Sequence, residues 1–204
     1  MSAPHHSRAS GSLRIRQITA DTDERDIVAV SALAVAAYGG DYTLTSEYLE
    51  EIGDVRARVA SADVWAAEFD GEIVGTVTLP RPGMRLHDDT ADDEMDVRLL
   101  AVDPCARRRG VGEALMRHSM EIARSRGARR VVLHTGSQMV GAQRLYERMG
   151  FDRIPEREYL FDVTGVTYRL MVYGFALAAG DVPESDARAE GGDRAREEAQ
   201  TVDA

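Results

Sequence analysis

The stretch VRLLAVDPCARRRGVGEALM, residues 97–116, decides the fold of this chain. An apolar run ends at Asp103-Pro104, where proline disfavours further regular structure, so the run predicts a strand over 95–102. An arginine-rich loop and Gly110-Val111-Gly112 then lead directly into an amphipathic helix. Glycines let the backbone approach a ligand, and the first N–H groups of a helix lack intrahelical partners. This arrangement predicts an anion-binding loop, while a simple basic turn at a helix start stays open.

Two common classes of nucleotide-binding loop do not fit this stretch. A Walker loop needs a lysine before its serine or threonine, and the chain contains no lysine. A dinucleotide fingerprint needs a third glycine and follows the first strand of its fold, whereas this loop follows the fourth predicted strand. The absence of lysine also excludes Schiff-base chemistry.

Outward from this stretch, hydrophobic periodicity predicts one α/β domain over residues 12–178. The predicted strands are 13–18, 64–69, 73–79, 95–102, 130–134, 151–161 and 167–177. The predicted helices are one that is capped near Thr22 and stopped by Gly39-Gly40, followed by 46–60, 112–126 and 140–149. The order is β-α-α-β-β-β-α-β-α-β-β, which indicates a mixed α+β sheet with helices on its faces.

The two ends of the chain differ from this domain in composition. Residues 1–11 are small and polar, and residues 179–204 are acidic with almost no apolar side chains. Such segments bury too little surface to offset the entropy of ordering, so both are predicted to be disordered tails.

Composition also limits the class of protein. The net charge of −10 argues against nucleic acid as a partner, because duplex binding depends on neutralising phosphates. No apolar run is long enough to span a bilayer and no secretory signal is visible, so a cytoplasmic protein without a membrane partner is expected. Cys105 is the single cysteine, which excludes an internal disulfide and a cysteine zinc cluster, and no metal is expected. The arginine excess is typical of a GC-rich bacterial genome, and a homodimer stays open.

Two motifs resemble those of one known family. Residues 107–112, RRRGVG, match the R/Q-x-x-G-x-G/A signature of the GCN5-related N-acetyltransferases (GNAT) and follow a strand ending LAVDP. Residues 142–151, AQRLYERMGF, resemble the second element of that family, A-x-x-L-Y-x-x-x-G-F. The order and separation of the motifs fit, and the resemblance implies a GNAT-like acyl-CoA N-acyltransferase fold.

The resemblance implies acetyl-CoA as co-substrate and direct transfer to an amine in a ternary complex. By family analogy, the pantetheine arm binds the backbones of Leu100, Ala101 and Val102. The cofactor site also includes Arg107, Arg108, Arg109, Gly110, Val111, Gly112, Ala142 and Tyr146. Tyr146 matches the tyrosine that protonates the departing thiolate, although packing in the core stays open for it. Met139 replaces an asparagine frequent in the family, with Ser137 or Gln138 as substitutes for its polar contact.

A protonated amine must lose a proton before it attacks a thioester, so a carboxylate near the acceptor is expected. Asp96 is the first candidate base and Glu94 the second. Strand residues alternate between faces, so Asp96 pointing away from the site is the competing interpretation. His134 ends a predicted strand and is either a proton relay or a core histidine.

The acceptor is the least determined part of the prediction. The acid-rich segment 87–94 and the segment 39–42 resemble the walls of the acceptor cleft in this family. The acids would steer a cationic amine, or they form an ordinary solvated loop. A small-molecule amine is the expected acceptor; a protein N-terminus or lysine, or a non-catalytic acyl-CoA sensor, are the alternatives.

Overall fold

The computed structural model describes residues 12–39, 45–163 and 165–178; both predicted tails lie outside the described residues. Its eight-stranded sheet has the order β1-β2-β3-β4-β5-β8-β6, with β7 paired to β8. The strands are β1 (Leu13–Ile18), β2 (Asp63–Phe69), β3 (Glu72–Leu79), β4 (Glu94–Val102), β5 (Arg130–Gly136), β6 (Asp152–Arg153), β7 (Tyr159–Val163) and β8 (Val166–Ala176). The helices are α1 (Glu24–Gly39), α2 (Ser46–Gly53), α3 (Val55–Ser61), α4 (Val111–Ser125) and α5 (Val140–Arg148), with 3-10 turns η1 (Pro104–Ala106) and η2 (Pro155–Arg157). The predicted mixed α/β architecture is confirmed.

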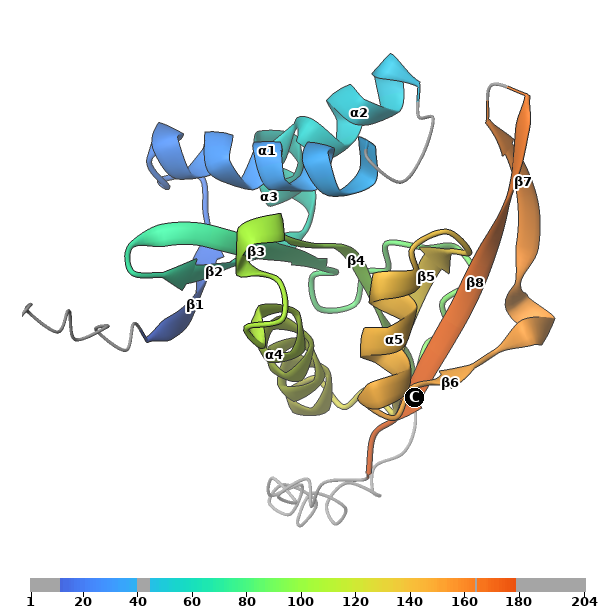
Figure 1. The fold of residues 1–204 in the computed structure, drawn as a ribbon. Helices are drawn as coiled ribbons and strands as arrows, with labels where there is room; N and C mark the ends of the chain where they lie inside the picture. Colours follow the sequence, from blue (N-terminus) through green and yellow to red (C-terminus); the bar gives the residue numbers. More distant parts are fainter. Residues whose placement is uncertain (1–11, 40–44, 164, 179–204) are drawn as a thin grey trace, which may run out of the picture.

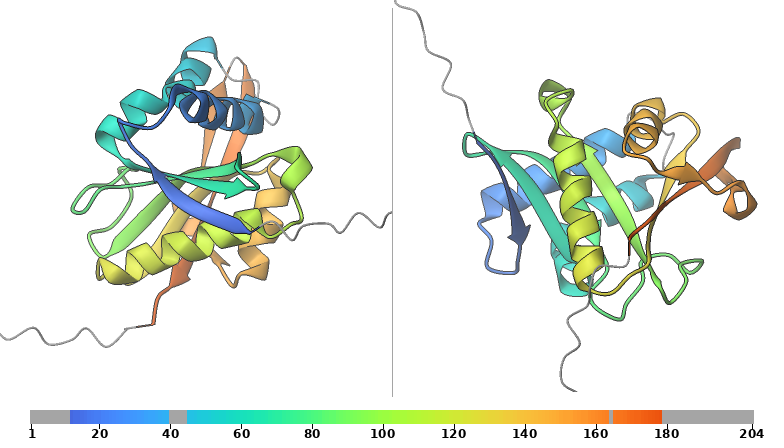
Figure 2. Two further views of the ribbon diagram at one scale, coloured as in Figure 1. Left: turned by 90° about the vertical axis from the view of Figure 1, so that its left-hand side faces the viewer. Right: turned by 90° about the horizontal axis from the view of Figure 1, so that it is seen from below.

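Helices cover both faces of this sheet (Figure 1). Helix α1 contacts β3 and β4 from one face, with α2 and α3 beside it, and α4 packs on the opposite face against the same two strands. Figure 2 shows, from below, that α5 lies on the same face as α4. The larger core cluster fills the space under α4 and includes Val77, Leu115 and Met116. Within the described residues no helix is long and apolar enough to cross a bilayer.

Strands β2 and β3 form a hairpin whose two turn residues are Asp70 and Gly71. Both turn residues have positive φ angles, 52° and 81°. These are the angles of the tight turn whose twist matches the strands, and they explain the preference for Asp-Gly there.

Two predicted elements are divided in the structure. The helix expected over 46–60 is interrupted at Asp54, whose side chain accepts a hydrogen bond from Ala57 N at 2.9 Å and so starts α3 as a new helix. The strand expected over 151–161 is divided into β6 and β7, because Pro155 begins the turn η2 and has no N–H for a sheet ladder.

Strands β4 and β5 are parallel neighbours only over their first residues. Their pairing runs from Glu94 opposite Arg130 to Val97 opposite Leu133. Further along, Ala101 pairs with β3, and β5 continues beside β8 to Gly136. The sheet therefore opens between β4 and β5.

A bulge in β4 lies at this opening. Thr76 pairs with Ala101 and Thr78 with Arg98, so two residues of β4, Leu99 and Leu100, oppose one residue of β3. Leu99 has a φ of 52°, which is unusual for a residue with a side chain. A bulge bends its strand, and here it turns consecutive side chains toward different hollows on the surface.

Candidate active site

The glycine-rich loop of the opening stretch forms the N-terminus of α4. Gly110 is the N-cap residue with a φ of 81°, a left-handed angle that glycine adopts without strain, and it makes no side-chain cap. A Cβ on Gly112 would lie 3.1 Å from Leu145 Cδ2, so the start of α4 lies close to α5. The first N–H groups of α4 therefore stand at the junction of the two helices.

A cleft of about 930 Å³ lies at this junction and contains most of the predicted cofactor residues. The predicted residues that line it are Leu100, Ala101, Val102, Arg107, Arg108, Gly110, Val111, Gly112 and Ala142. Arg109 lies elsewhere: its guanidinium carbon is 3.9 Å from the ring centroid of Phe69. Met139 and Gln138 also line the cleft, at the position where the family's asparagine was expected.

Arginine side chains give the cleft a positive character. Arg107 and Arg108 come from the loop before α4, and Arg144 and Arg148 come from α5. The single acid of the lining, Glu113, is paired with Arg117 at 2.8 Å. A positive cleft at a helix N-terminus suits a phosphate-bearing ligand. Arg144 and Arg148 were not predicted, although their spacing of four residues on a helix places them on one face.

A second pocket, of about 520 Å³, lies where β4 and β5 separate. Its wall is mainly aromatic and aliphatic, with two histidines, one arginine and one acid, Asp162. The lining residues include Tyr38, Tyr48, His87, Arg98, Leu99, His134, Met139, Tyr159, Phe161 and Leu170. Met139 lines both hollows, and consecutive residues of the β4 bulge divide between them, Leu100 in the cleft and Leu99 in the pocket. The cleft and this aromatic pocket therefore adjoin at the opening of the sheet.

Asp96, the first predicted base, lies on β4 but lines neither hollow. It is 1% exposed, and both of its carboxylate oxygens accept from Leu86 N, at 2.9 and 3.2 Å. Burial raises the pKa of Asp96, opposed by that hydrogen bond and by the charges of His87 and Arg98. Its visible role is to hold the loop before β4 against the strand.

Glu94, the second predicted base, is engaged in ion pairs. Arg157 donates to both of its carboxylate oxygens, at 2.9 and 3.1 Å, and Arg130 lies 3.2 Å away. Ala91 N also donates to this carboxylate, at 3.1 Å. Glu94 therefore joins the loop, β4, β5 and η2.

Tyr146 lies in the main core, 5% exposed, and is not part of the cleft lining. Its ring centroid is 6.0 Å from that of Phe151 and 5.8 Å from that of Tyr173. The second motif thus contributes to the cleft through Ala142, Arg144, Leu145 and Arg148, and not through the tyrosine.

His134 lies at the end of the parallel pairing and meets two residues of the loop before β4. His134 Nε2 is 3.1 Å from Asp89 Oδ2, and its ring stacks on that of His87 at a centroid distance of 3.9 Å. Within the described part of the chain, His87, Asp89 and His134 also form a group whose potential ligand atoms lie within 4.8 Å of one another. The sequence predicts His134 as a candidate relay, and it includes His87 and Asp89 only as part of the acid-rich segment 87–94.

Three of the five acids of the segment 87–94 form ion pairs with arginine. Arg157 lies 3.2 Å from Asp89 and 2.9 Å from Glu94, and Arg85 lies 2.8 Å from Asp92. The loop reaches the aromatic pocket through His87. Its acids are therefore mostly committed to ion pairs, which weakens the case for steering of a cation.

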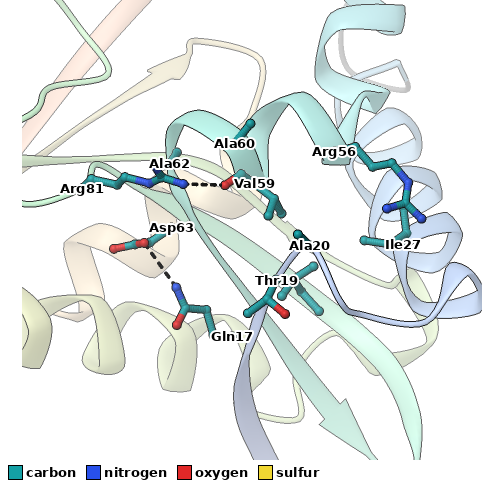
Figure 3. A pocket seen from close by; sticks show the side chains of 11 residues that line it. Gln17, Thr19, Ala20, Ile27, Arg56, Val59, Ala60, Ala62, Asp63 and Arg81 are labelled. Carbon is teal, nitrogen blue, oxygen red and sulfur yellow. Dashed lines mark hydrogen bonds between the residues drawn. The ribbon is translucent and has the colours of Figure 1, made fainter.

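A further pocket, of about 320 Å³, lies between the end of β1 and helix α3 (Figure 3). Its polar groups are already bonded: Gln17 donates to Asp63 at 3.2 Å, and Arg81 donates to Val59 O at 2.8 Å. It shares no lining residue with the cleft or the aromatic pocket, so it is not part of this site.

Comparison with known proteins places this geometry in a family. The model of the acetyltransferase (GNAT) family matches residues 27–151. Mycothiol acetyltransferase of Cellulomonas flavigena is 32% identical over 146 residues, which are 68% of this chain and 40% of that protein. The N-acetyltransferase YjgM of Escherichia coli, itself uncharacterised, is 30% identical over 125 residues, which are 61% of this chain and 69% of that protein. The chain spans about half the length of several curated relatives that it matches.

A solved structure supports the fold independently. The acetyltransferase yncA of Salmonella typhimurium, determined with acetyl-CoA, superposes with a TM-score of 0.58 at 21% identity, covering 85% of this chain and 99% of that one. At this identity the likeness concerns the fold, which agrees with the predicted one. The family model extends over more than half of the chain and includes both predicted motifs. The chain therefore belongs to the GNAT acetyltransferase family.

Proposed function

We propose that this protein transfers the acetyl group of acetyl-CoA to the primary amine of a small molecule, by direct attack in a ternary complex. The observation that carries the proposal is the positive cleft at the start of α4, which adjoins the aromatic pocket where β4 and β5 separate. Acetyl-CoA would lie with its pyrophosphate at Gly110–Gly112 and its pantetheine arm along β4. Its thioester would then reach the opening between the strands, beside the second pocket.

The size and walls of the aromatic pocket favour a small acceptor with an apolar body. Its volume of about 520 Å³ is in the ordinary range for small-molecule sites. His87, Tyr159 and Phe161 come from the loop and from β7, and Tyr38 and Tyr48 come from α1 and α2, so several separate elements contribute to the wall. A peptide acceptor would need an open groove instead.

Arg98 adds a charge preference to this pocket. Arg98 lines the pocket, and no carboxylate of the described residues forms an ion pair with it within 4.0 Å. The acid of the same lining, Asp162, accepts a hydrogen bond from Thr167 Oγ1 at 2.5 Å. A carboxylate on the acceptor would supply that partner through charge-assisted hydrogen bonds. The favoured acceptor is therefore an apolar amino acid or a similar amine with an acidic group, which narrows the cationic amine that the acid-rich loop suggested.

The test is a CoA-release assay with matched acceptors. Phenylalanine, phenylalanine amide and 2-phenylethylamine share one aromatic body and differ in the acidic group. Spermidine, an aminoglycoside and two peptides, one with a free N-terminus and one with only a free lysine side chain, represent the other classes. We expect the highest kcat/KM for phenylalanine or another apolar amino acid. A preference for a peptide would favour the protein acetyltransferase, and acetyl-CoA binding without CoA release from any acceptor would favour the sensor.

A further inference from the structure

Two histidines of the aromatic pocket, His87 from the loop before β4 and His134 from β5, meet an acid of the same loop, Asp89. The rings of His87 and His134 are stacked, with planes 16° apart. Asp89 Oδ1 lies 3.4 Å from His87 Nδ1, and Asp89 Oδ2 lies 3.1 Å from His134 Nε2. One carboxylate thus orients both imidazoles.

This orientation fixes which ring nitrogens can take a proton. If His134 Nε2–H donates to Asp89, the lone pair of His134 is on Nδ1, which is buried and has no hydrogen-bond partner among the described residues. The side chain of His87 is 25% exposed and that of His134 only 6%, and both line the pocket. His87 is therefore the ring that an acceptor meets first, with His134 behind it.

The surroundings favour neutral imidazoles. Burial lowers the pKa of His87, and His134 and Arg98 lower it further, whereas Asp89 and Asp96 oppose them. Burial also lowers the pKa of His134, against the opposing effect of Asp89. The charged and titratable groups that face the pair are Asp89 from the loop, Asp96 and Arg98 from β4, and Arg157 from η2. A neutral imidazole near neutral pH is able to accept a proton.

We propose that the stacked pair His87 and His134, oriented by Asp89, is the proton acceptor for the amine, in place of Asp96 or Glu94. This inference rests on the proposed acetyltransferase function. The ammonium gives one proton to the imidazole, and the neutral nitrogen attacks the thioester carbonyl, forming the C–N bond. The C–S bond breaks and the departing thiolate takes up one proton. The nitrogen loses its second proton as the amide forms, so the proton count on nitrogen and sulfur balances. The imidazolium then releases the first proton to solvent.

The same three residues are less suited to a metal ion. Arg157 donates to the same oxygen, Asp89 Oδ2, at 3.2 and 3.3 Å, so a cation there would face a guanidinium. Stacked rings hold their nitrogen lone pairs in nearly parallel planes, whereas two histidines on one metal direct theirs to a common centre. Proton transfer is the chemistry that fits both observations.

The test uses His87→Gln, the double variant H87Q/H134Q and, as a matched control, His118→Gln. His118 is a partly buried histidine on α4 that contacts Trp65 at a centroid distance of 4.3 Å and lines neither hollow. We expect kcat/KM near neutral pH to fall roughly 10²–10⁴-fold in the double variant. The acetyl-CoA dissociation constant and the melting temperature should stay near those of wild type, and His118→Gln should keep full activity.

The pH profile separates a proton acceptor from a structural role. In wild type, kcat/KM should rise with pH through the lowered imidazole pKa and level off near neutral pH. In the double variant the rise at the imidazole pKa should vanish. Its kcat/KM should instead keep rising toward the pKa of the amine, so the ratio of wild-type to variant kcat/KM becomes smaller at high pH. A constant defect at every pH, or loss of the same limb in Asp96→Asn, would overturn the proposal.

Two further outcomes have distinct meanings. Inactivation of wild type by a chelator, with Zn²⁺ restoring activity and binding only when both histidines are present, would overturn the proposal in favour of a metal site. An active wild type whose double variant is equally active would refute the proton acceptor alone. A wild type that acetylates no amine of the panel would refute the proposed function itself.

Discussion

Tyr146 contacts the rings of Phe151 and Tyr173, and the resemblance of the second motif to its family predicts that it acts as the acid. The two roles are compatible only if the hydroxyl reaches the end of the cleft when acetyl-CoA is bound. Removal of the hydroxyl oxygen would leave most contacts of the ring in place, so the substitution of Tyr146 by phenylalanine distinguishes the packing role from the acid role.

For Tyr146→Phe we expect kcat to fall roughly 10²–10⁴-fold, because the departing thiolate loses its proton donor. The dissociation constant of acetyl-CoA, measured by calorimetry, should hardly change. Phe151→Leu tests the packing alone and should lower the melting temperature more than turnover. Full turnover in Tyr146→Phe would assign the tyrosine to the core.

Arg98 tests the charge preference of the aromatic pocket. Arg98→Gln should raise the KM for phenylalanine roughly tenfold to a hundredfold, since a charge-assisted hydrogen bond contributes about 1.5–3 kcal/mol. The KM for 2-phenylethylamine, which has no carboxylate, should stay the same. Arg98→Lys should lie between, because it keeps the charge but loses the planar fork. Equal changes for both acceptors would remove Arg98 from acceptor recognition.

At the scale of elements, the strand, loop and helix of residues 95–125 could be predicted because their signals are local. Proline ends the strand, glycine starts the helix, and the apolar residues keep one period. The division of the helix over 46–60 depends on one side-chain hydrogen bond of Asp54, which periodicity does not reveal. The sequence did not predict the pairing of His87 with His134, because the two rings meet only when the loop before β4 folds onto β5.

The start of α4 carries the prediction at this scale. Gly110→Asp places bulk and a negative charge where the pyrophosphate is expected, so acetyl-CoA binding should weaken at least a hundredfold by calorimetry. Gly127→Asp is the matched control: Gly127 follows the other end of α4 with a similar φ, 76°, and a Cβ on either glycine has no neighbour within 4 Å.

Both variants incur similar backbone strain, so a loss of affinity in Gly110→Asp alone reports on the loop. Gly110→Ala separates charge from strain, and it should weaken binding far less. Equal affinities in wild type and Gly110→Asp would contradict the placement of the cofactor.

At the scale of the whole molecule, both core clusters lie between Ile18 and Leu177. The predicted domain of 12–178 contains every residue of them, and of the cleft and the aromatic pocket. A chain restricted to 12–178 should therefore melt within about 2 °C of the full chain, a difference below roughly 1 kcal/mol at this size. Its acetyl-CoA affinity should be the same. A drop of several degrees would show that the outer segments contribute to the fold.

The donor side of the site was more predictable than the acceptor side for a physical reason. Apart from Ala37 of α1, the residues that line the cleft lie in the run from Leu100 to Glu113 and in the segment from Gln138 to Arg148. The aromatic pocket draws its residues from α1, α2, the loop before β4, β4, β5, β7 and β8. Its chemistry arises from tertiary packing, which no spacing in the sequence encodes.

The position of β8 has a consequence for biosynthesis. This strand is the last of the sheet in chain order, yet it lies between β5 and β6 and pairs along all of β5, from Arg130 opposite Ala176 to Gly136 opposite Leu170. While the chain is still on the ribosome, β5 leaves the exit tunnel first and keeps an open edge, with Val131, Val132 and Leu133 uncovered. If translation stops within residues 166–176, we therefore expect a product that aggregates, although every residue that lines the donor cleft has been translated.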